Sequence, residues 1–322
     1  MELVDKLSNR QYIDGEWVES SNKNTRDIIN PYNQETIFTV AEGTKEDVER
    51  AILAARRSFE DGEWSLETSE VRGKKVRAVA DKIKENREEL AKLETLDTGK
   101  TLEESYADMD DIHNVFMYFA GLADKDGGEI INSPIPNAES KVVKEPVGVV
   151  TQITPWNYPL LQASWKIAPA LATGCSLVMK PSEITPLTTI RVFELMEEVG
   201  FPKGTINLVL GAGSEVGDVM SGHEEVDLVS FTGGIETGKH IMKQAANHVT
   251  DVALELGGKN PNIIFDDADF ELAVDQALNG GYFHAGQVCS AGSRILVHND
   301  IKDKFEKALI DRVSKIGRAH VW

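Results

Sequence analysis

The chain has 322 residues, with 53 acidic and 34 basic side chains and a net charge of −19. Hydrophobic residues make up 41% of it and charged residues 27%, as in a globular protein and unlike a disordered or collagen-like one. A single hydrophobic core rarely serves more than about 250–300 residues, so we expect two domains or more. The acidic excess argues against nucleic-acid binding and against an anionic-membrane surface, because both need clustered lysine and arginine.

Two cysteines, Cys175 and Cys289, are too few for a disulfide framework and indicate a reducing compartment. The N-terminus has no apolar segment behind a basic one, so no secretory signal is expected. Apolar runs are strand-sized and do not approach the roughly 18 residues of a membrane span. We therefore expect a cytoplasmic protein that does not enter a membrane.

The first half of the chain is predicted to be mainly helical. Thr44 and Asp47 have the spacing of a capping box, and apolar residues at helical spacing follow them. Apolar residues between 76 and 96 recur every three or four positions and predict one long amphipathic helix. Residues 97–100 interrupt the pattern, and a further helix is predicted from 102 toward 120.

From residue 142 onward, strand-like and helix-like segments alternate. Strands are predicted at 147–153, 176–180, 206–210, 226–231 and 262–265. Helices are predicted between them at 188–199 and 238–246, and a last one at 304–315. Such alternation predicts a parallel sheet covered by helices, in which ligands bind at the carboxyl ends of the strands.

Cys289 lies among small residues in the segment 286–292, where a substrate can come close. A lone cysteine is more often a small buried hydrophobic residue, and Cys175 fits that description better. A cysteine nucleophile usually needs an activating partner. His284 is near in sequence, but no residue that would orient it can be named, so the residues alone leave the role of Cys289 open.

Glu255 and Asn157 each follow a strand-like run. Glu255 stands beside paired glycines, where a desolvated carboxylate can act as a general base, although a solvated loop acid is the simpler interpretation. Asn157 is flanked by Trp156 and by prolines, so its amide can be preorganised to donate to an oxyanion. An asparagine turn with aromatic packing fits that segment equally well.

Three turns after strands can contact a nucleotide. One contains Gly213 and Gly217 but has one residue more than the dinucleotide fingerprint G-x-G-x-x-G. The segment 231–234 precedes a helix whose first N–H groups can hold an anion. Lys180 and Glu183 can hydrogen-bond ribose hydroxyls. The alternatives are ordinary strand-to-helix turns and a solvated ion pair.

In order and spacing, these motifs together resemble the NAD(P)-dependent aldehyde dehydrogenase superfamily over nearly the whole chain, and look closest to its betaine-aldehyde dehydrogenases. The matching motifs are Pro155-Trp156-Asn157, Lys180-Pro181-Ser182-Glu183, Phe231-Thr232-Gly233-Gly234, Glu255-Leu256-Gly257-Gly258-Lys259 and Gly286-Gln287-Val288-Cys289. The resemblance implies an α/β fold with a Rossmann-type parallel-sheet cofactor domain, an incomplete α/β catalytic domain and partial oligomerisation strands.

The resemblance also implies roles for single residues. Cys289 would be the nucleophile, and the Asn157 amide with the Cys289 N–H would hold the oxyanion. Glu255 would activate the water that hydrolyses a thioester. NAD would be the cofactor in preference to NADP, because Glu183 should repel a 2′-phosphate. The residues implied to bind it are Trp156, Lys180, Glu183, Gly213, Gly217, Phe231, Thr232, Gly233, Gly234 and Leu256.

The implied substrate is a small-molecule aldehyde, betaine aldehyde above others, oxidised to the osmoprotectant glycine betaine. Its quaternary ammonium cannot hydrogen-bond and is best held by aromatic faces. By the resemblance, Tyr158, Trp165 and Phe283 would line that site, and Trp165 packing in a helix core is the alternative. The resemblance implies no metal, and the full-length form is expected to be a homo-oligomer, either dimer or tetramer.

The resemblance divides the chain into a cofactor domain (1–130 and 151–254), oligomerisation strands (131–150) and the start of a catalytic domain (255–315). Family members continue further, so we expect a truncation at the carboxyl end. Residues 316–322 are expected to be non-native, because Ile-Gly-Arg-Ala-His-Val matches one reading frame of a common sequencing-adapter oligonucleotide.

Two other classes of protein stay open at this point. One is a cysteine hydrolase or thioesterase that works without a nucleotide, and the paired nucleotide-contact motifs speak against it. The other is an inactive fragment or a non-catalytic binding protein on the same fold, in which Cys289 would be unreactive.

Overall fold

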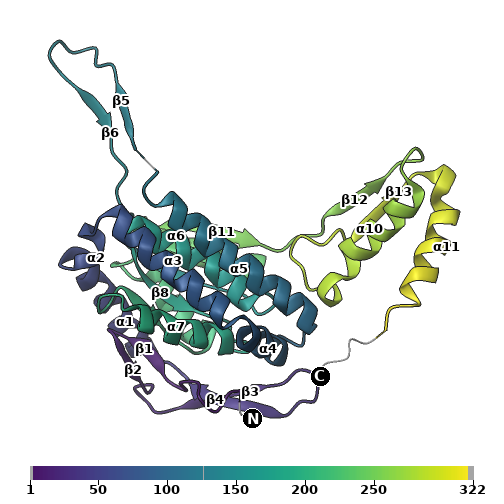
Figure 1. The fold of residues 1–322 in the computed structure, drawn as a ribbon, viewed down its shortest axis with the longest axis horizontal. Coiled ribbons are helices and arrows are strands. Elements are labelled where there is room, and N and C mark those ends of the chain that lie inside the picture. The colour runs from purple at the N-terminus through teal and green to yellow at the C-terminus, as the bar shows by residue number, and fades with distance from the viewer. Residues whose placement is uncertain (1–2, 126, 318–322) are drawn as a thin grey trace.

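The computed structural model describes residues 3–125 and 127–317 (Figure 1). Its helices are α1 (Lys45–Glu60), α2 (Glu63–Leu66), α3 (Ser69–Glu85), α4 (Arg87–Thr98), α5 (Leu102–Leu122), α6 (Pro159–Thr173), α7 (Leu187–Val199), α8 (Asp218–Gly222), α9 (Ile235–Ala245), α10 (Phe270–Tyr282) and α11 (Lys302–Val313). Its strands are β1 (Gln11–Ile13), β2 (Glu16–Val18), β3 (Thr25–Ile29), β4 (Thr36–Ala41), β5 (Glu129–Ile131), β6 (Ser140–Val142), β7 (Val149–Ile153), β8 (Ser176–Lys180), β9 (Ile206–Leu208), β10 (Leu228–Gly233), β11 (Asp251–Leu256), β12 (Pro261–Ile264) and β13 (Arg294–Val297).

Within the described residues, seven strands form the main sheet in the order β11-β10-β7-β8-β9-β1-β2. The strands from β11 to β9 are parallel, and β1 runs antiparallel to both of its neighbours. The chain proceeds outward from β7 to β9 and then returns to the other side of β7 with β10 and β11. The strand order therefore reverses between β7 and β10, which is where open α/β sheets bind their ligands. The predicted α/β class with a parallel-sheet core is confirmed.

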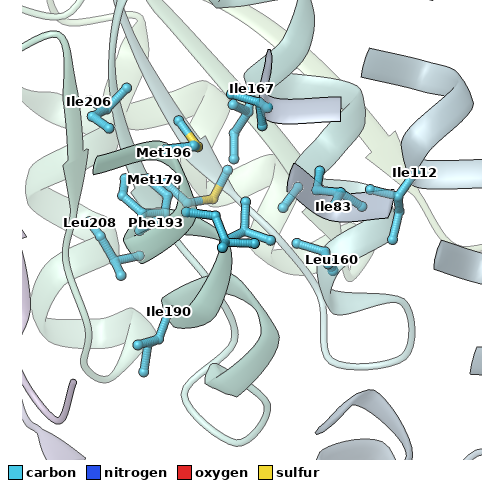
Figure 2. Close-up of a cluster of buried hydrophobic side chains, with 14 of the residues drawn as sticks. Ile83, Ile112, Leu160, Ile167, Met179, Ile190, Phe193, Met196, Ile206 and Leu208 are labelled. Atoms are coloured by element: carbon cyan, nitrogen blue, oxygen red, sulfur yellow. The ribbon is translucent and has the colours of Figure 1, made fainter. Parts of the chain in front are cut away.

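Helices cover both faces of this sheet, because successive strand residues point to opposite sides. On one face Leu177 and Met179 belong to a core shared with α3, α5, α6 and α7. Figure 2 shows Phe193 and Met196 of α7 in that core beside Met179. On the other face Val178 belongs to a second core that includes residues of α1, α8 and α9. The carboxyl ends of the central strands are thus held from both sides.

The single helix predicted between 76 and 96 is in fact two helices, α3 and α4, which meet at Asn86. The Asn86 side-chain amide donates to the Lys82 carbonyl at 2.8 Å, a local bond with which asparagine competes against helix continuation. The apolar period runs through the break because both helices pack against α5. The capping box of Thr44 and Asp47 is confirmed at the start of α1.

In the part of the chain that the structure describes, three pairs of strands lie outside the main sheet: β3 with β4, β5 with β6, and β12 with β13. The β5–β6 hairpin projects away from the helices in Figure 1. The strand predicted at 262–265 does not extend the main sheet, because β12 pairs in parallel with β13 and packs with α10 and α11.

The predicted domain limits after residues 130 and 254 fall inside β5 and β11, and the division stays a prediction. Residues 318–322 of the predicted non-native tail lie outside the described residues. In the described part of the chain, no helix has the length and apolar character to cross a membrane.

Candidate active site

A cleft of about 490 Å³ opens at the carboxyl ends of β7, β8, β10 and β11, beside the reversal of strand order. Each strand end contributes one of the motifs that the sequence singled out. The predicted site residues in its lining are Trp156, Asn157, Tyr158, Trp165, Lys180, Glu183, Gly213, Phe231, Thr232, Gly233, Gly234, Glu255, Leu256 and Cys289. The fold therefore gathers six separate segments into one site.

Two predicted site residues, Gly217 and Phe283, are not in the lining of this cleft. The Gly213 motif has one residue more than the dinucleotide fingerprint, and the segment Gly213–Gly217 forms a π-helical turn. The last glycine of this turn, Gly217, is buried at the start of α8. Phe283 begins a short helical turn and is 50% exposed. Their proposed contacts with cofactor and substrate stay predictions.

The Asn157 side chain reaches the segment that carries Cys289. Its Nδ2 donates to the Gln287 carbonyl at 2.8 Å. Cys289 is a free, exposed thiol, and among the described residues its backbone N–H has no hydrogen-bond acceptor. A thiol, a backbone N–H and a side-chain amide thus lie at one cleft, as attack on a carbonyl and stabilisation of its oxyanion require.

His284 does not form a catalytic pair with Cys289. It is buried, is not in the lining of the cleft, and its Nε2 lies 2.9 Å from the backbone carbonyl of Asn157. The expectation that Cys175 is a core residue agrees with its burial. This geometry disfavours the cysteine hydrolase that the sequence left open, because the histidine nearest in sequence is engaged elsewhere.

Glu255 lies near the end of β11, the edge strand of the main sheet, and is exposed. Of the two interpretations left open for its carboxylate, the solvated loop acid agrees with this structure and the desolvated carboxylate does not, since the residues from Glu255 to Asn260 are all exposed. Its place in the cleft together with Cys289 agrees with the predicted pairing of the two residues.

Lys166 is a charged residue near the site that the sequence analysis missed. It is buried in α6, and its Nζ donates to Ser230 Oγ at 3.1 Å. Burial lowers the pKa of Lys166 to about 8, and the negative charge of Glu255 opposes that shift. Lys166 is the single charged residue of α6, and that was the signal that could have identified it.

An ion pair lies at the carboxyl end of β8, and it is half-buried. The alternative interpretation of a solvated ion pair is therefore wrong. Lys180 is buried, and its Nζ donates to Glu183 Oε2 and to the Pro181 carbonyl, both at 3.0 Å. Burial lowers the pKa of Lys180, opposed by the Glu183 charge. Burial also acts to raise the pKa of Glu183, but the charge of Lys180, hydrogen bonds from the backbone and from Lys180, and the charge of Arg26 together outweigh it, so that the pKa is lowered. The Glu183 carboxylate and the Lys180 amino group therefore face the cleft together.

The turn after β10 offers backbone groups to the cleft. Gly234 is the N-cap of α9, and a Cβ there would meet no described atom within 4 Å, so an anion can approach the first N–H groups of this helix. Thr232 is held by a hydrogen bond from its Oγ1 to Gln162 Oε1 at 3.1 Å. Ser182, which lies inside the 180–183 motif, and Thr237 also line the cleft; neither was predicted as a site residue, because a hydroxyl side chain alone does not indicate a function.

Two of the aromatic side chains that line the cleft were predicted to contact the substrate. Trp165 is 49% exposed and lines the cleft, so the alternative in which it packs in a helix core is wrong. Tyr158 is partly buried, and the Lys100 Nζ lies 4.3 Å from its ring centroid. Burial and the negative charges of Asp108 and Glu104 raise the pKa of Tyr158, which keeps its hydroxyl neutral.

Comparison with known proteins agrees with this arrangement. Betaine aldehyde dehydrogenase of Bacillus subtilis (strain 168) is 65% identical over 310 residues, which are 96% of this chain and 63% of that protein. Aminoaldehyde dehydrogenase 2 of Zea mays is 47% identical over 306 residues, 93% of this chain and 60% of that protein. A 1.90 Å crystal structure of betaine aldehyde dehydrogenase from Staphylococcus aureus in complex with NAD+ is 88% identical, with a TM-score of 0.98 over 100% of this chain and 64% of that one.

The chain thus spans slightly less than two thirds of the length of these relatives. The sequence model of the aldehyde dehydrogenase family matches residues 17–320, nearly the whole chain. On this match and the structural likeness to the Staphylococcus protein, the chain belongs to the aldehyde dehydrogenase family.

Proposed function

We propose that the protein carrying this sequence oxidises an aldehyde, betaine aldehyde above others, to the carboxylic acid with NAD. The observation that carries the proposal is the meeting of Cys289, Asn157 and Glu255 with the Lys180–Glu183 pair in one cleft. The names of the Bacillus and Staphylococcus relatives support the same reaction.

The residues of the cleft fit a dinucleotide. Glu183 can accept hydrogen bonds from ribose hydroxyls and Lys180 can donate to them. The open N-terminus of α9 at Gly234 would receive the pyrophosphate. The chemistry that bound NAD supplies is acceptance of a hydride, which turns the adduct on Cys289 into a thioester.

The protein's own residues account for the remaining steps. The Cys289 thiolate forms a C–S bond with the aldehyde carbon, and the carbonyl π electrons move to oxygen. The Asn157 amide and the Cys289 N–H donate to that oxyanion. After oxidation, Glu255 takes a proton from water as the water oxygen bonds to the thioester carbon. The C–S bond then breaks, which releases the carboxylic acid and restores the thiolate.

A cationic substrate suits the wall and the net charge of −19. Aromatic faces of Tyr158 and Trp165 would hold a quaternary ammonium at about 0.5–2 kcal/mol per contact. The maize relative is named for aminoaldehydes, whose ammonium can also donate hydrogen bonds. Measuring kcat/KM for betaine aldehyde and for a set of aminoaldehydes distinguishes the two substrate classes. We expect kcat/KM for betaine aldehyde to be higher by tenfold or more.

We also propose a cytoplasmic location and a homodimer or homotetramer for the whole protein. The two free cysteines support a reducing compartment. Exposed apolar residues on the β5–β6 hairpin support association of subunits, among them Ile130, which is 82% exposed.

The nucleophile is tested by Cys289→Ala in the full-length protein, or in this chain completed with the remaining residues of the Staphylococcus relative. NADH formation with betaine aldehyde should fall at least a thousandfold, because the C–S bond cannot form. Cys175→Ala is the matched control and should keep the rate within twofold, since that thiol is buried in the core. Retention of the rate by Cys289→Ala would refute the proposal. Thioester hydrolysis without any NAD-dependent stabilisation would favour the thioesterase.

Glu255→Gln separates the two halves of the reaction. The variant should release one equivalent of NADH per active site in a burst and then turn over about a hundredfold more slowly, because general-base catalysis is worth about 100–10,000-fold. Stopped-flow absorbance of NADH measures both phases. A normal steady-state rate would contradict the role of Glu255. Loss of the burst would show that Glu255 acts in a step before the thioester forms, and not in its hydrolysis.

A further inference from the structure

We propose that His284 is a positioning residue, which holds the Asn157 backbone so that its side-chain amide stays aimed at the oxyanion position beside Cys289. The inference rests on the proposed function, because it concerns the same oxyanion site. His284 neither lines the cleft nor pairs with the thiol, so the reaction itself gives it no other role.

The contacts of His284 join three separate parts of the chain. Its Nε2 lies 2.9 Å from the backbone carbonyl of Asn157, which is 127 residues away in sequence. Its backbone N–H donates to Glu104 Oε1 at 3.0 Å, across 180 residues. Glu104 is itself held in the capping box of α5 through Thr101. The histidine is therefore anchored to a helix end on one side and to the oxyanion segment on the other.

These bonds belong to a closed ring that includes the nucleophile loop. Asn157 Nδ2 donates to the Gln287 carbonyl at 2.8 Å, and the Gln287 N–H donates to the His284 carbonyl at 3.0 Å. Cys289 follows two residues later. A change at any member of the ring therefore alters the position of the Asn157 amide relative to the Cys289 sulfur.

The direction of the His284 bond follows from its partner. A backbone carbonyl only accepts, so Nε2 must carry the proton that it donates. Burial and the positive charge of Lys100 lower the pKa of His284, so the ring is neutral and the proton on Nε2 defines its tautomer. Glu104 and Tyr158 also lie near the His284 imidazole. The centroids of the Tyr158 and His284 rings are 5.1 Å apart, in an edge-on arrangement.

The backbone at this point is unfavourable without such contacts. His284 and Ala285 have φ angles of +47° and +54°, in the left-handed region that side chains other than glycine seldom adopt. Two successive residues of this kind cost on the order of 1–3 kcal/mol each, and persist where surrounding bonds compensate. The three hydrogen bonds of His284 provide that compensation at the turn that leads into the nucleophile loop.

The test compares two replacements in the completed full-length protein. His284→Phe keeps a ring against Tyr158 but removes the donor to Asn157. His284→Gln places an amide N–H near the position of Nε2. We expect His284→Phe to lower kcat about tenfold with the KM for NAD unchanged, part of the 100–1,000-fold that a whole oxyanion donor provides. His284→Gln should restore kcat to within about threefold.

His113→Phe is the matched control. His113 also contacts a backbone carbonyl, that of Ala80 at 3.0 Å, but lies on α5 and is not in the cleft lining. Its replacement should leave kcat within twofold. Thermal unfolding of every variant shows whether the chain is folded. If His284→Phe does not fold, His284→Gln still tests the inference, because a loss of kcat greater than about threefold in that variant would contradict it.

A double-mutant cycle with Asn157→Ala decides whether His284 acts through the Asn157 amide. In that background, His284→Phe should cause no further loss of kcat. A further tenfold loss would overturn the inference, as would equal rates for His284→Phe and the parent, or equal losses in the Phe and Gln variants. Failure of the proposed function looks different, because Asn157→Ala and Cys289→Ala would then themselves retain the parent rate.

Discussion

Two side chains of opposite charge stand in contrasting surroundings near the cleft. Glu255 is exposed at an edge strand, whereas Lys166 is buried in α6 with its Nζ on Ser230. A carboxylate in water keeps its charge at little cost, but a buried ammonium loses solvation that one hydroxyl does not replace. The pKa of Lys166, lowered to about 8 by burial against the opposing charge of Glu255, expresses that cost.

Lys166 should therefore make the free energy of unfolding depend on pH in the alkaline range. Between its folded pKa of about 8 and the ordinary 10.5, the unfolded chain binds more protons, so the unfolding free energy rises with pH. Relative to Lys166→Met, the parent chain should gain about 2 kcal/mol between pH 7 and pH 9.5. Urea unfolding at the two pH values measures this, with Lys239→Met at an exposed helix position as the control for the new methionine. If the difference in unfolding free energy between the parent and Lys166→Met were the same at both pH values, the effect of burial on the Lys166 pKa would be contradicted.

The start of β7 shows how one turn ties several elements together. Gly148 has a φ of +133°, and a Cβ there would lie 1.9 Å from Asp227 Oδ2. That oxygen accepts from the Val149 N–H at 2.7 Å and from Arg56 Nη2 at 2.6 Å. The turn thus joins the central strand of the cleft to the segment before β10 and to α1. A side chain at Gly148 must break this arrangement.

Gly148→Ala should accordingly destabilise the chain by about 2–4 kcal/mol, through backbone strain and loss of the Asp227 bonds. Gly213→Ala is the matched control, because a Cβ at that position meets no described atom within 4 Å and its φ is outside the left-handed region. Its effect should stay within about 0.5 kcal/mol. Urea unfolding of both variants tests the pair, and equal stabilities would refute the argument.

For the molecule as a whole, cofactor binding and global stability are linked, because the proposed NAD site is assembled from the ends of four strands of one sheet. A ligand that binds only the folded chain at 100 times its Kd adds about 2.7 kcal/mol to the unfolding free energy. The ionised Glu183, beside Lys180 at the end of β8, should oppose the extra charge of a 2′-phosphate.

NAD should consequently raise the thermal midpoint of this chain more than NADP does at the same concentration. Glu183→Gln should narrow the difference, since it removes the charge and keeps an acceptor for the ribose. Differential scanning fluorimetry with both nucleotides measures the midpoints. Equal shifts in the parent chain would show that Glu183 does not select the cofactor, and no shift with either would count against nucleotide binding.

Much of this site was predictable because its motifs follow strands. Asn157, Lys180, Thr232 and Glu255 lie at or just beyond the ends of parallel strands, and such ends share one edge of a sheet whatever their separation in sequence. Alternating apolar runs and capping residues, such as Thr44, are local signals of the same kind. They indicated the sheet, most of its helices and the membership of the cleft.

Other features depended on neighbours that are distant in the sequence. His284 reaches Asn157 and Glu104 across 127 and 180 residues. The burial of Lys166 and the exposure of Glu255 depend on which elements cover them. Local patterns encode backbone propensity and the direction of an apolar face, so they sufficed for elements and strand ends. Hydrogen-bond partners, desolvation and the resulting pKa shifts arise from packing between elements, and the folded chain alone defines them.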